Sequence, residues 1–181
     1  MISRSMRLSS AVFLLAFGAA TSASAQVTLD VKNALTIGAL SSSEAGLEAK
    51  PGWSLEASLG YGVNPSLTVF GGYARTAFGC DEGFCSGIDV KVSGNHGLLG
   101  LEVNKGAPFA RVALLYGKTS VTGSDDAEAG LGVRLGIGGS FGGSVRIRPG
   151  ISFSWMDAST ADLSANAAAF SFGLGVLIPL G

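Results

Sequence analysis

His96 is the single histidine of the chain, and so the side chain best suited to act as a general base near neutral pH. A hydrolytic site would also need a nucleophile within hydrogen-bond reach of its ring, and Ser93 is the nearest hydroxyl in sequence. Side chains three residues apart on a regular strand point to opposite faces unless a β-bulge intervenes. The spacing therefore favours a histidine placed inside a β-structure over a catalytic pair.

The two cysteines, Cys80 and Cys85, lie five positions apart in one polar segment. A structural zinc site usually takes four ligands, so two thiols without a second pair are a weak zinc signal. A turn at Glu82-Gly83 would bring the thiols together, and an exported chain meets an oxidising compartment. We expect a local disulfide, with metal binding as the alternative.

Adjacent carboxylates in two predicted loops are the remaining candidates for ion binding. They are Asp81, Glu82, Asp125 and Asp126. Hard divalent cations take carboxylate oxygens, so the four groups could bind calcium or magnesium if the loops converge. A solvated acidic rim is the alternative. No cofactor is predicted, because the chain contains neither a phosphate-binding loop nor a nucleophile elbow.

The segment 128–157 shows which structure positions these groups. Large apolar residues alternate there with glycine, serine and arginine, which is the period of a β-strand with two different faces. A Gly142-Gly143 turn divides the segment into a hairpin. The apolar positions are Leu131, Val133, Leu135, Ile137 and Phe141 in the first arm, and Val145, Ile147, Ile151, Phe153 and Trp155 in the second.

The same alternation predicts six further strands at 27–40, 53–63, 67–78, 88–103, 109–121 and 169–180. The phase of 67–78 is ambiguous and leaves the face of Arg75 unassigned. In 88–103 the large apolar residues change from even to odd positions, which predicts a bulge near 95–97. Eight strands joined alternately by short turns and longer polar loops predict an all-β fold, an eight-stranded antiparallel up-and-down transmembrane β-barrel.

Charged residues on the polar strand faces would then point into the lumen of the barrel. They are Glu56, Lys91, Arg111, Glu128, Arg134, Arg146 and Arg148, with Glu102 included if the bulge holds. A mixed-sign set of this size in a narrow barrel predicts an ion-pair network that fills the interior. A narrow conducting pore is the functional alternative.

The first 25 residues predict export. Arg4 and Arg7 precede an apolar run over 11–20, and Ala23-Ser24-Ala25 matches a signal-peptidase site. We expect a signal peptide at 1–25 and a barrel domain at 26–181. The mature chain would carry ten basic and thirteen acidic residues, so no nucleic-acid partner is indicated. The full sequence has a mean hydropathy of +0.43 and 28 glycines, which fits strands that face lipid.

Taken together, these features resemble the small eight-stranded outer-membrane barrels of the OmpA and OmpX type. Aromatic residues support the resemblance, because they fall where two interfacial girdles would lie. Near loop ends they are Trp53, Tyr116, Trp155 and Phe170, and near turn ends they are Tyr61, Phe109 and Phe141. The resemblance implies an outer-membrane location, membrane lipid as partner, a monomer, and a structural or surface-interaction role.

Two alternatives from other classes remain. One is a lipid A-modifying enzyme, although the residues around His96 lack the His-x-Ser arrangement of the lipid A deacylases. The other is a soluble lipocalin-like carrier, which would have a hollow apolar interior instead of a charged one.

Cys80 and Cys85 should be bridged to each other in the exported protein. Mass spectrometry of protein purified from intact cell envelopes, alkylated without reduction, should show neither thiol labelled. Two labelled thiols would contradict the prediction.

Overall fold

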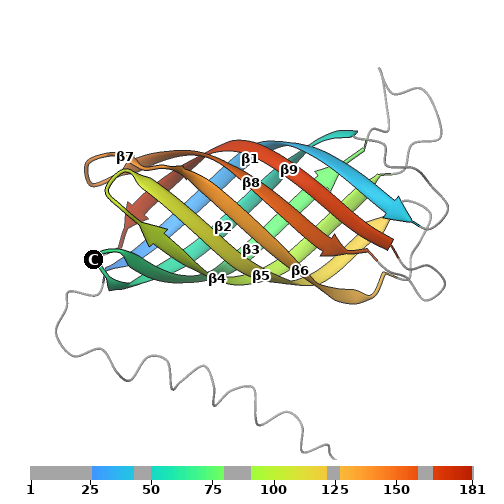
Figure 1. The fold of residues 1–181 in the computed structure, drawn as a ribbon, viewed down its shortest axis with the longest axis horizontal. Coiled ribbons are helices and arrows are strands. Elements are labelled where there is room, and N and C mark those ends of the chain that lie inside the picture. Colours follow the sequence, from blue (N-terminus) through green and yellow to red (C-terminus); the bar gives the residue numbers. More distant parts are fainter. Residues whose placement is uncertain (1–25, 43–49, 80–90, 122–126, 159–164, 181) are drawn as a thin grey trace, which may run out of the picture.

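The computed structural model describes residues 26–42, 50–79, 91–121, 127–158 and 165–180, and these form a closed antiparallel β-barrel (Figure 1). Its strands are β1 (Val27–Ser42), β2 (Lys50–Asn64), β3 (Leu67–Phe78), β4 (Val92–Asn104), β5 (Pro108–Val121), β6 (Ala129–Gly139), β7 (Phe141–Gly142), β8 (Arg146–Asp157) and β9 (Ala165–Pro179). Within the described ranges, no helix is long and apolar enough to cross a membrane.

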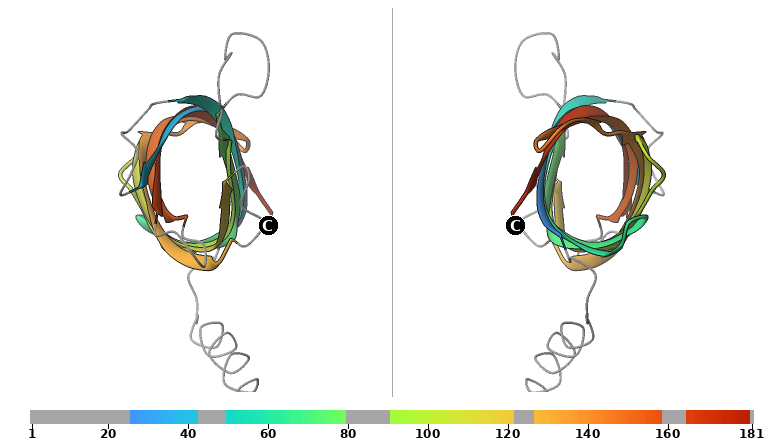
Figure 2. Two further views of the ribbon diagram at one scale, coloured as in Figure 1. Left: turned by 90° about the vertical axis from the view of Figure 1, so that its right-hand side faces the viewer. Right: turned by 90° about the vertical axis from the view of Figure 1, so that its left-hand side faces the viewer.

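Each strand pairs with its neighbours in the sequence, and pairing of β1 with β9 closes the barrel (Figure 2). Val31, for example, lies opposite Ala57 of β2 on one side and Val176 of β9 on the other. Since β6 and β7 both pair with β8, they are two parts of one barrel strand, and the barrel has eight strands. The predicted fold class is confirmed.

The break between β6 and β7 has a local cause in Pro149. The registers of β6 and β7 against β8 place this residue opposite Gly139, and proline has no N–H to donate to the ladder. On the other side of the strand the pairing continues, because the N–H of Ser140 donates to the carbonyl of Ala107 at 2.8 Å. Gly142 still pairs with Arg146, so the connection comprises residues 143–145 and not Gly142-Gly143 as predicted.

Strand β4 contains no bulge, so the predicted bulge near 95–97 is wrong. Its register is continuous against both β3 and β5, and its even positions, from Val92 through His96 to Glu102, are buried inside the barrel. The lumen near the loop ends is itself apolar, so Val92 and Leu98 point inward like the polar residues of the same strand. An apolar interior therefore produced the apparent change of phase.

Strand β3 also has apolar residues that point into the lumen, and its phase puts Arg75, whose face the sequence left unassigned, on the outside. Phe70, Ala74 and Phe78 are buried in the lumen, whereas Tyr73 and Arg75 are exposed on the outer face. Two large aromatic rings thus belong to the interior of this barrel.

The outer face is apolar almost throughout, as lipid contact requires. Trp53, Tyr116, Trp155 and Phe170 are exposed near the loop ends, as expected for an interfacial girdle. The prediction that Phe109 belongs to the girdle at the turn ends is wrong, because this residue is 4 % exposed and lies inside the barrel. Gly138 makes the space for it, since a Cβ there would lie 2.5 Å from the Phe109 ring.

Replacing Leu135, which is half exposed on the outer face of β6, with arginine should destabilise the barrel in lipid by about 2 to 4 kcal/mol. The same change at Val63, near the turn end of β2, should cost at most about 1 kcal/mol. Urea unfolding of the refolded variants in vesicles measures both values. Equal costs at the two positions would contradict the assignment of the outer face to lipid.

Candidate functional site

Seven charged side chains from six strands meet inside the barrel, and we call them the lumen charge cluster. They are Asp30 and Lys32 of β1, Glu56 of β2, Glu102 of β4, Arg111 of β5, Arg134 of β6 and Arg148 of β8. All point inward because the alternation of each strand puts them on its concave face. Asp30 and Lys32 are additions to the predicted set, and Glu102, predicted to point inward only with a bulge, does so without one.

Arg111 is the centre of the cluster. Its Nη1 donates to Asp30 Oδ2 at 3.0 Å and to Glu56 Oε1 at 2.9 Å. Its Nη2 donates to Ser58 Oγ at 3.2 Å, and its Nε lies 3.0 Å from Glu102 Oε2 as an ion pair without hydrogen-bond geometry. One guanidinium therefore contacts carboxylates of three different strands across the lumen.

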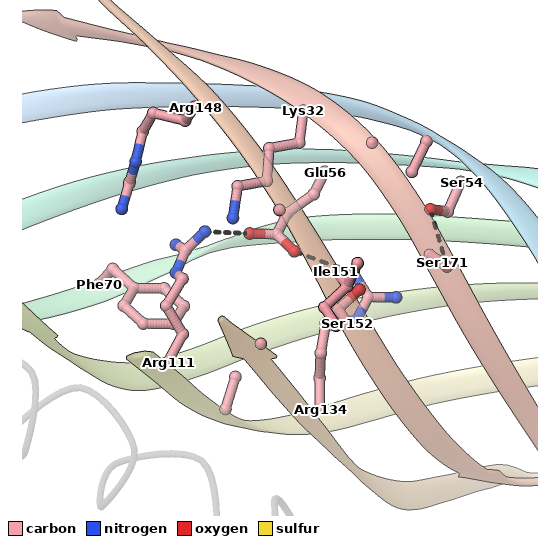
Figure 3. Close-up of a pocket in the computed structure, with 15 residues that line it drawn as sticks. Lys32, Ser54, Glu56, Phe70, Arg111, Arg134, Arg148, Ile151, Ser152 and Ser171 are labelled. Carbon is pink, nitrogen blue, oxygen red and sulfur yellow. Dashed lines mark hydrogen bonds and ion pairs between the residues drawn. The ribbon is translucent and has the colours of Figure 1, made fainter. Parts of the chain in front are cut away.

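Arg134 extends the cluster toward the loop ends (Figure 3). Its Nη1 donates to Glu56 Oε2 at 2.9 Å, so Glu56 uses one oxygen for each of two arginines. Its Nε and Nη2 donate to Ser154 Oγ at 2.7 Å and to Thr76 Oγ1 at 3.0 Å. All three nitrogens of this guanidinium are thus partnered.

Arg148 extends the cluster in the other direction. Its Nη1 donates to Asp30 Oδ2 at 2.7 Å, and its Nη2 forms an ion pair with Glu102 at 2.8 Å. The guanidinium carbon lies 3.8 Å from the centre of the Phe109 ring, and that of Arg111 lies 3.9 Å from the centre of the Phe70 ring. Phe70 and Phe109 therefore each support one arginine.

Glycines provide the space for these aromatic rings. A Cβ on Gly100 would lie 2.6 Å from the Phe70 ring, and one on Gly138 would lie 2.5 Å from the Phe109 ring. These two glycines therefore admit the phenylalanines on which the arginines stack.

Burial makes the pairing obligatory. A charge removed from water costs several kcal/mol unless opposite charges and hydrogen bonds replace its hydration. Asp30, Glu56 and Glu102 are each less than 10 % exposed, and four cations surround them. Mixed charge is therefore a condition of folding for this lumen.

Toward the loop ends the lumen becomes progressively apolar. A layer of hydroxyls comes first, in which Thr36 Oγ1 and Ser171 Oγ lie 2.8 Å apart. Beyond it an apolar core fills the barrel. Its residues include Phe78, Val92, Leu98, Leu115, Met156 and the alanines Ala165, Ala167 and Ala169.

His96 belongs to this apolar part of the lumen. It is 3 % exposed, and its Nε2 lies 3.2 Å from Thr119 Oγ1. Ser93 stands at an outward position of the same strand, because no bulge intervenes. The two side chains therefore do not form a pair.

Little open space remains at the level of the charges. A cavity of about 40 Å³ reaches between Lys32, Glu56, Arg111 and Arg134, which is room for a few water molecules (Figure 3). A larger cavity of about 410 Å³ lies on the side of the short turns and extends to Arg148. We call this larger cavity the vestibule; it ends at the lumen charge cluster.

The other predicted site residues lie elsewhere. Lys91, Glu128 and Arg146 are exposed at or beside strand ends, where the wall of the barrel no longer encloses them. The predicted disulfide and cation residues lie outside the described residues, namely Cys80, Cys85, Asp81, Glu82, Asp125 and Asp126. In the part of the chain that is described, no three potential ligand groups are arranged to hold a metal ion.

Neither a protein-family profile nor a curated protein sequence matches the chain. Among solved structures, neisserial surface protein A (NspA) is 19 % identical with a TM-score of 0.55, over 83 % of this chain and 96 % of that one. Ail, the attachment invasion locus protein of Yersinia pestis, is 17 % identical with a TM-score of 0.53, over 83 % and 98 %. The chain has the fold of the small eight-stranded outer-membrane β-barrels.

Replacing Arg111 with methionine should destabilise the folded barrel by about 3 to 5 kcal/mol, because three buried carboxylates lose their common partner. Arg146→Met removes the same charge from an exposed position and serves as the control. Urea unfolding in vesicles compares the two variants. A loss for Arg111→Met no larger than for the control would show that the cluster does not hold the barrel together.

Proposed function

We propose that the protein is a monomeric outer-membrane β-barrel that acts through its outer surface, as a structural or surface-interaction protein. The observation that carries the proposal is the lumen charge cluster. It occupies the barrel between a vestibule and an apolar core, which favours a role at the surface over transport through the interior. The proposal includes export by a cleaved signal peptide at residues 1–25.

Solved structures of the same fold support a surface role. One structure of Ail, 15 % identical with a TM-score of 0.52 over 84 % of this chain and 99 % of that one, is a complex with the heparin analogue sucrose octasulfate. The name of that protein refers to attachment and invasion. A barrel of this fold can therefore form a complex with a sulfated sugar, which supports an interaction role.

The other functions are less well supported by the geometry. A soluble carrier needs a hollow apolar interior and a polar outside, whereas this barrel has a largely filled interior with buried charges and an apolar outside. A lipid-modifying enzyme needs its base at the lipid surface, and His96 is buried in the lumen. A narrow pore is the strongest rival, because the vestibule already opens toward one end.

A measurement of ion conductance distinguishes the proposed surface role from a pore. The refolded protein, inserted in planar lipid bilayers and checked for folding by heat-modifiable gel mobility, should show no steady conductance in potassium chloride. The physical reason is that the lumen charge cluster, with its four arginine and lysine side chains, and the apolar core beyond it fill the interior. A steady conductance that scales with the amount of inserted protein would replace the proposed role with that of a pore.

A further inference from the structure

Two cationic side chains stand on the outward face of the described strands, where nearly every other position is apolar or small. They are Arg75 of β3 and Lys118 of β5. A charge on the lipid-facing side of a barrel is costly near the middle of the membrane and is tolerated near an interface. Both residues lie toward the loop ends of their strands, which is the interfacial level.

Strand register brings the two cations to one level. Asn95 of β4 pairs with Arg75 on one side and with Lys118 on the other, and all three side chains are exposed. Neighbouring strands lie about 4.8 Å apart, so the Cα atoms of the two cations are about 10 Å apart. Arginine and lysine side chains are long enough for both to contact one ligand group that lies between them. We call Arg75, Asn95 and Lys118 the outer basic row.

The central amide of the row is oriented by a neighbour. Tyr73 donates its hydroxyl to Asn95 Oδ1 at 2.6 Å. That bond occupies the acceptor of the amide, so the Nδ2 group, a donor, is left for another molecule. The row therefore presents two positive charges with a hydrogen-bond donor between them, an arrangement that matches an anion.

Within the described part of the chain, neither cation has an acidic partner. No carboxylate of the described residues forms an ion pair with Arg75 or Lys118, and Arg75 instead packs 5.6 Å from the centre of the Trp53 ring. Tyr116 stands one outward position before Lys118. Such aromatic neighbours are typical of the level of lipid headgroups.

Below the row, away from the loops, the surface is suited to hydrocarbon chains. Leu99, Leu114 and Leu131 are each more than half exposed there. Leu99 and Leu114 are register partners, one outward position below Gly97 and Tyr116. An anionic group at the row would therefore have apolar surface directly beneath it.

We propose that the outer basic row binds the phosphate of an anionic lipid in the leaflet next to the loops, with the lipid chains lying over Leu99, Leu114 and Leu131. Arg75 and Lys118 supply the charge, and the Asn95 amide donates the central hydrogen bond. A lipid is favoured over a soluble anion because the row stands on the membrane-facing wall, above continuous apolar surface. This inference rests on the proposed membrane location.

Lipid retention tests the site. The refolded barrel is reconstituted in vesicles of phosphatidylcholine and phosphatidic acid, extracted in mild detergent, and the retained lipids are counted by native mass spectrometry. The parent should retain phosphatidic acid in preference to phosphatidylcholine. Arg75→Gln and Lys118→Gln should each lower that preference about fivefold, the effect of one cation at an anionic surface, and the double variant should abolish it.

The matched control removes the same number of charges at the other end of the barrel, in Lys105→Gln combined with Arg146→Gln. It should retain phosphatidic acid like the parent.

Equal retention by the outer double variant and the parent, or equal loss in the control, would overturn the site. A barrel that failed to enter vesicles would contradict both this site and the membrane location, whereas an inserted barrel without lipid preference contradicts the site alone. Binding of a soluble sulfated oligosaccharide at the row, without lipid retention, would overturn the lipid assignment.

Discussion

The barrel depends on one electrostatic constraint, that charges buried in its narrow lumen must neutralise one another across the interior. Arg111 satisfies three carboxylates from β1, β2 and β4 at once, and Glu56 connects it to Arg134 on β6. The contacts of Arg111 with Asp30 and Glu56, and that of Glu56 with Arg134, join strands that share no ladder hydrogen bonds, whereas Glu102 lies on the neighbouring strand. The lumen charge cluster therefore stabilises the contacts across the barrel, as an apolar core does in a soluble domain. Loss of one member leaves an unpaired buried charge and so destabilises the fold.

Lipid outside and charge inside also explain how the lumen is divided. The vestibule, the lumen charge cluster, the hydroxyl layer and the apolar core follow one another from the short turns to the loops. Beyond the vestibule, each layer is filled by side chains of the surrounding strands, with glycine where Phe70, Phe78 and Phe109 need space. A filled interior leaves the two ends and the outer wall for function, and the outer basic row is the one place on that wall where described strands carry cations.

Alternation alone predicted much of this fold, and its failures share one cause. The hairpin at 128–157 could be predicted because its large apolar side chains face lipid, with Met156 as the exception. The rule failed at Phe109 and around 95–97, where apolar residues enter the lumen and look like a change of phase. Asp30 and Lys32 followed the rule, and the sequence could have added them to the network. The outer basic row could not be predicted, because it requires the register of three strands and the outward phase of Arg75.

A double-mutant cycle on Glu56 and Arg134 tests most directly whether the buried charges act as one unit. Glu56→Gln, Arg134→Gln and the variant with both changes are unfolded in urea in the same vesicles as the parent. If the pair is coupled as its 2.9 Å contact indicates, the double variant should be less destabilised than the sum of the single changes by about 0.5 to 3 kcal/mol. Costs that add within about 0.5 kcal/mol would contradict a lumen held together by mutual neutralisation.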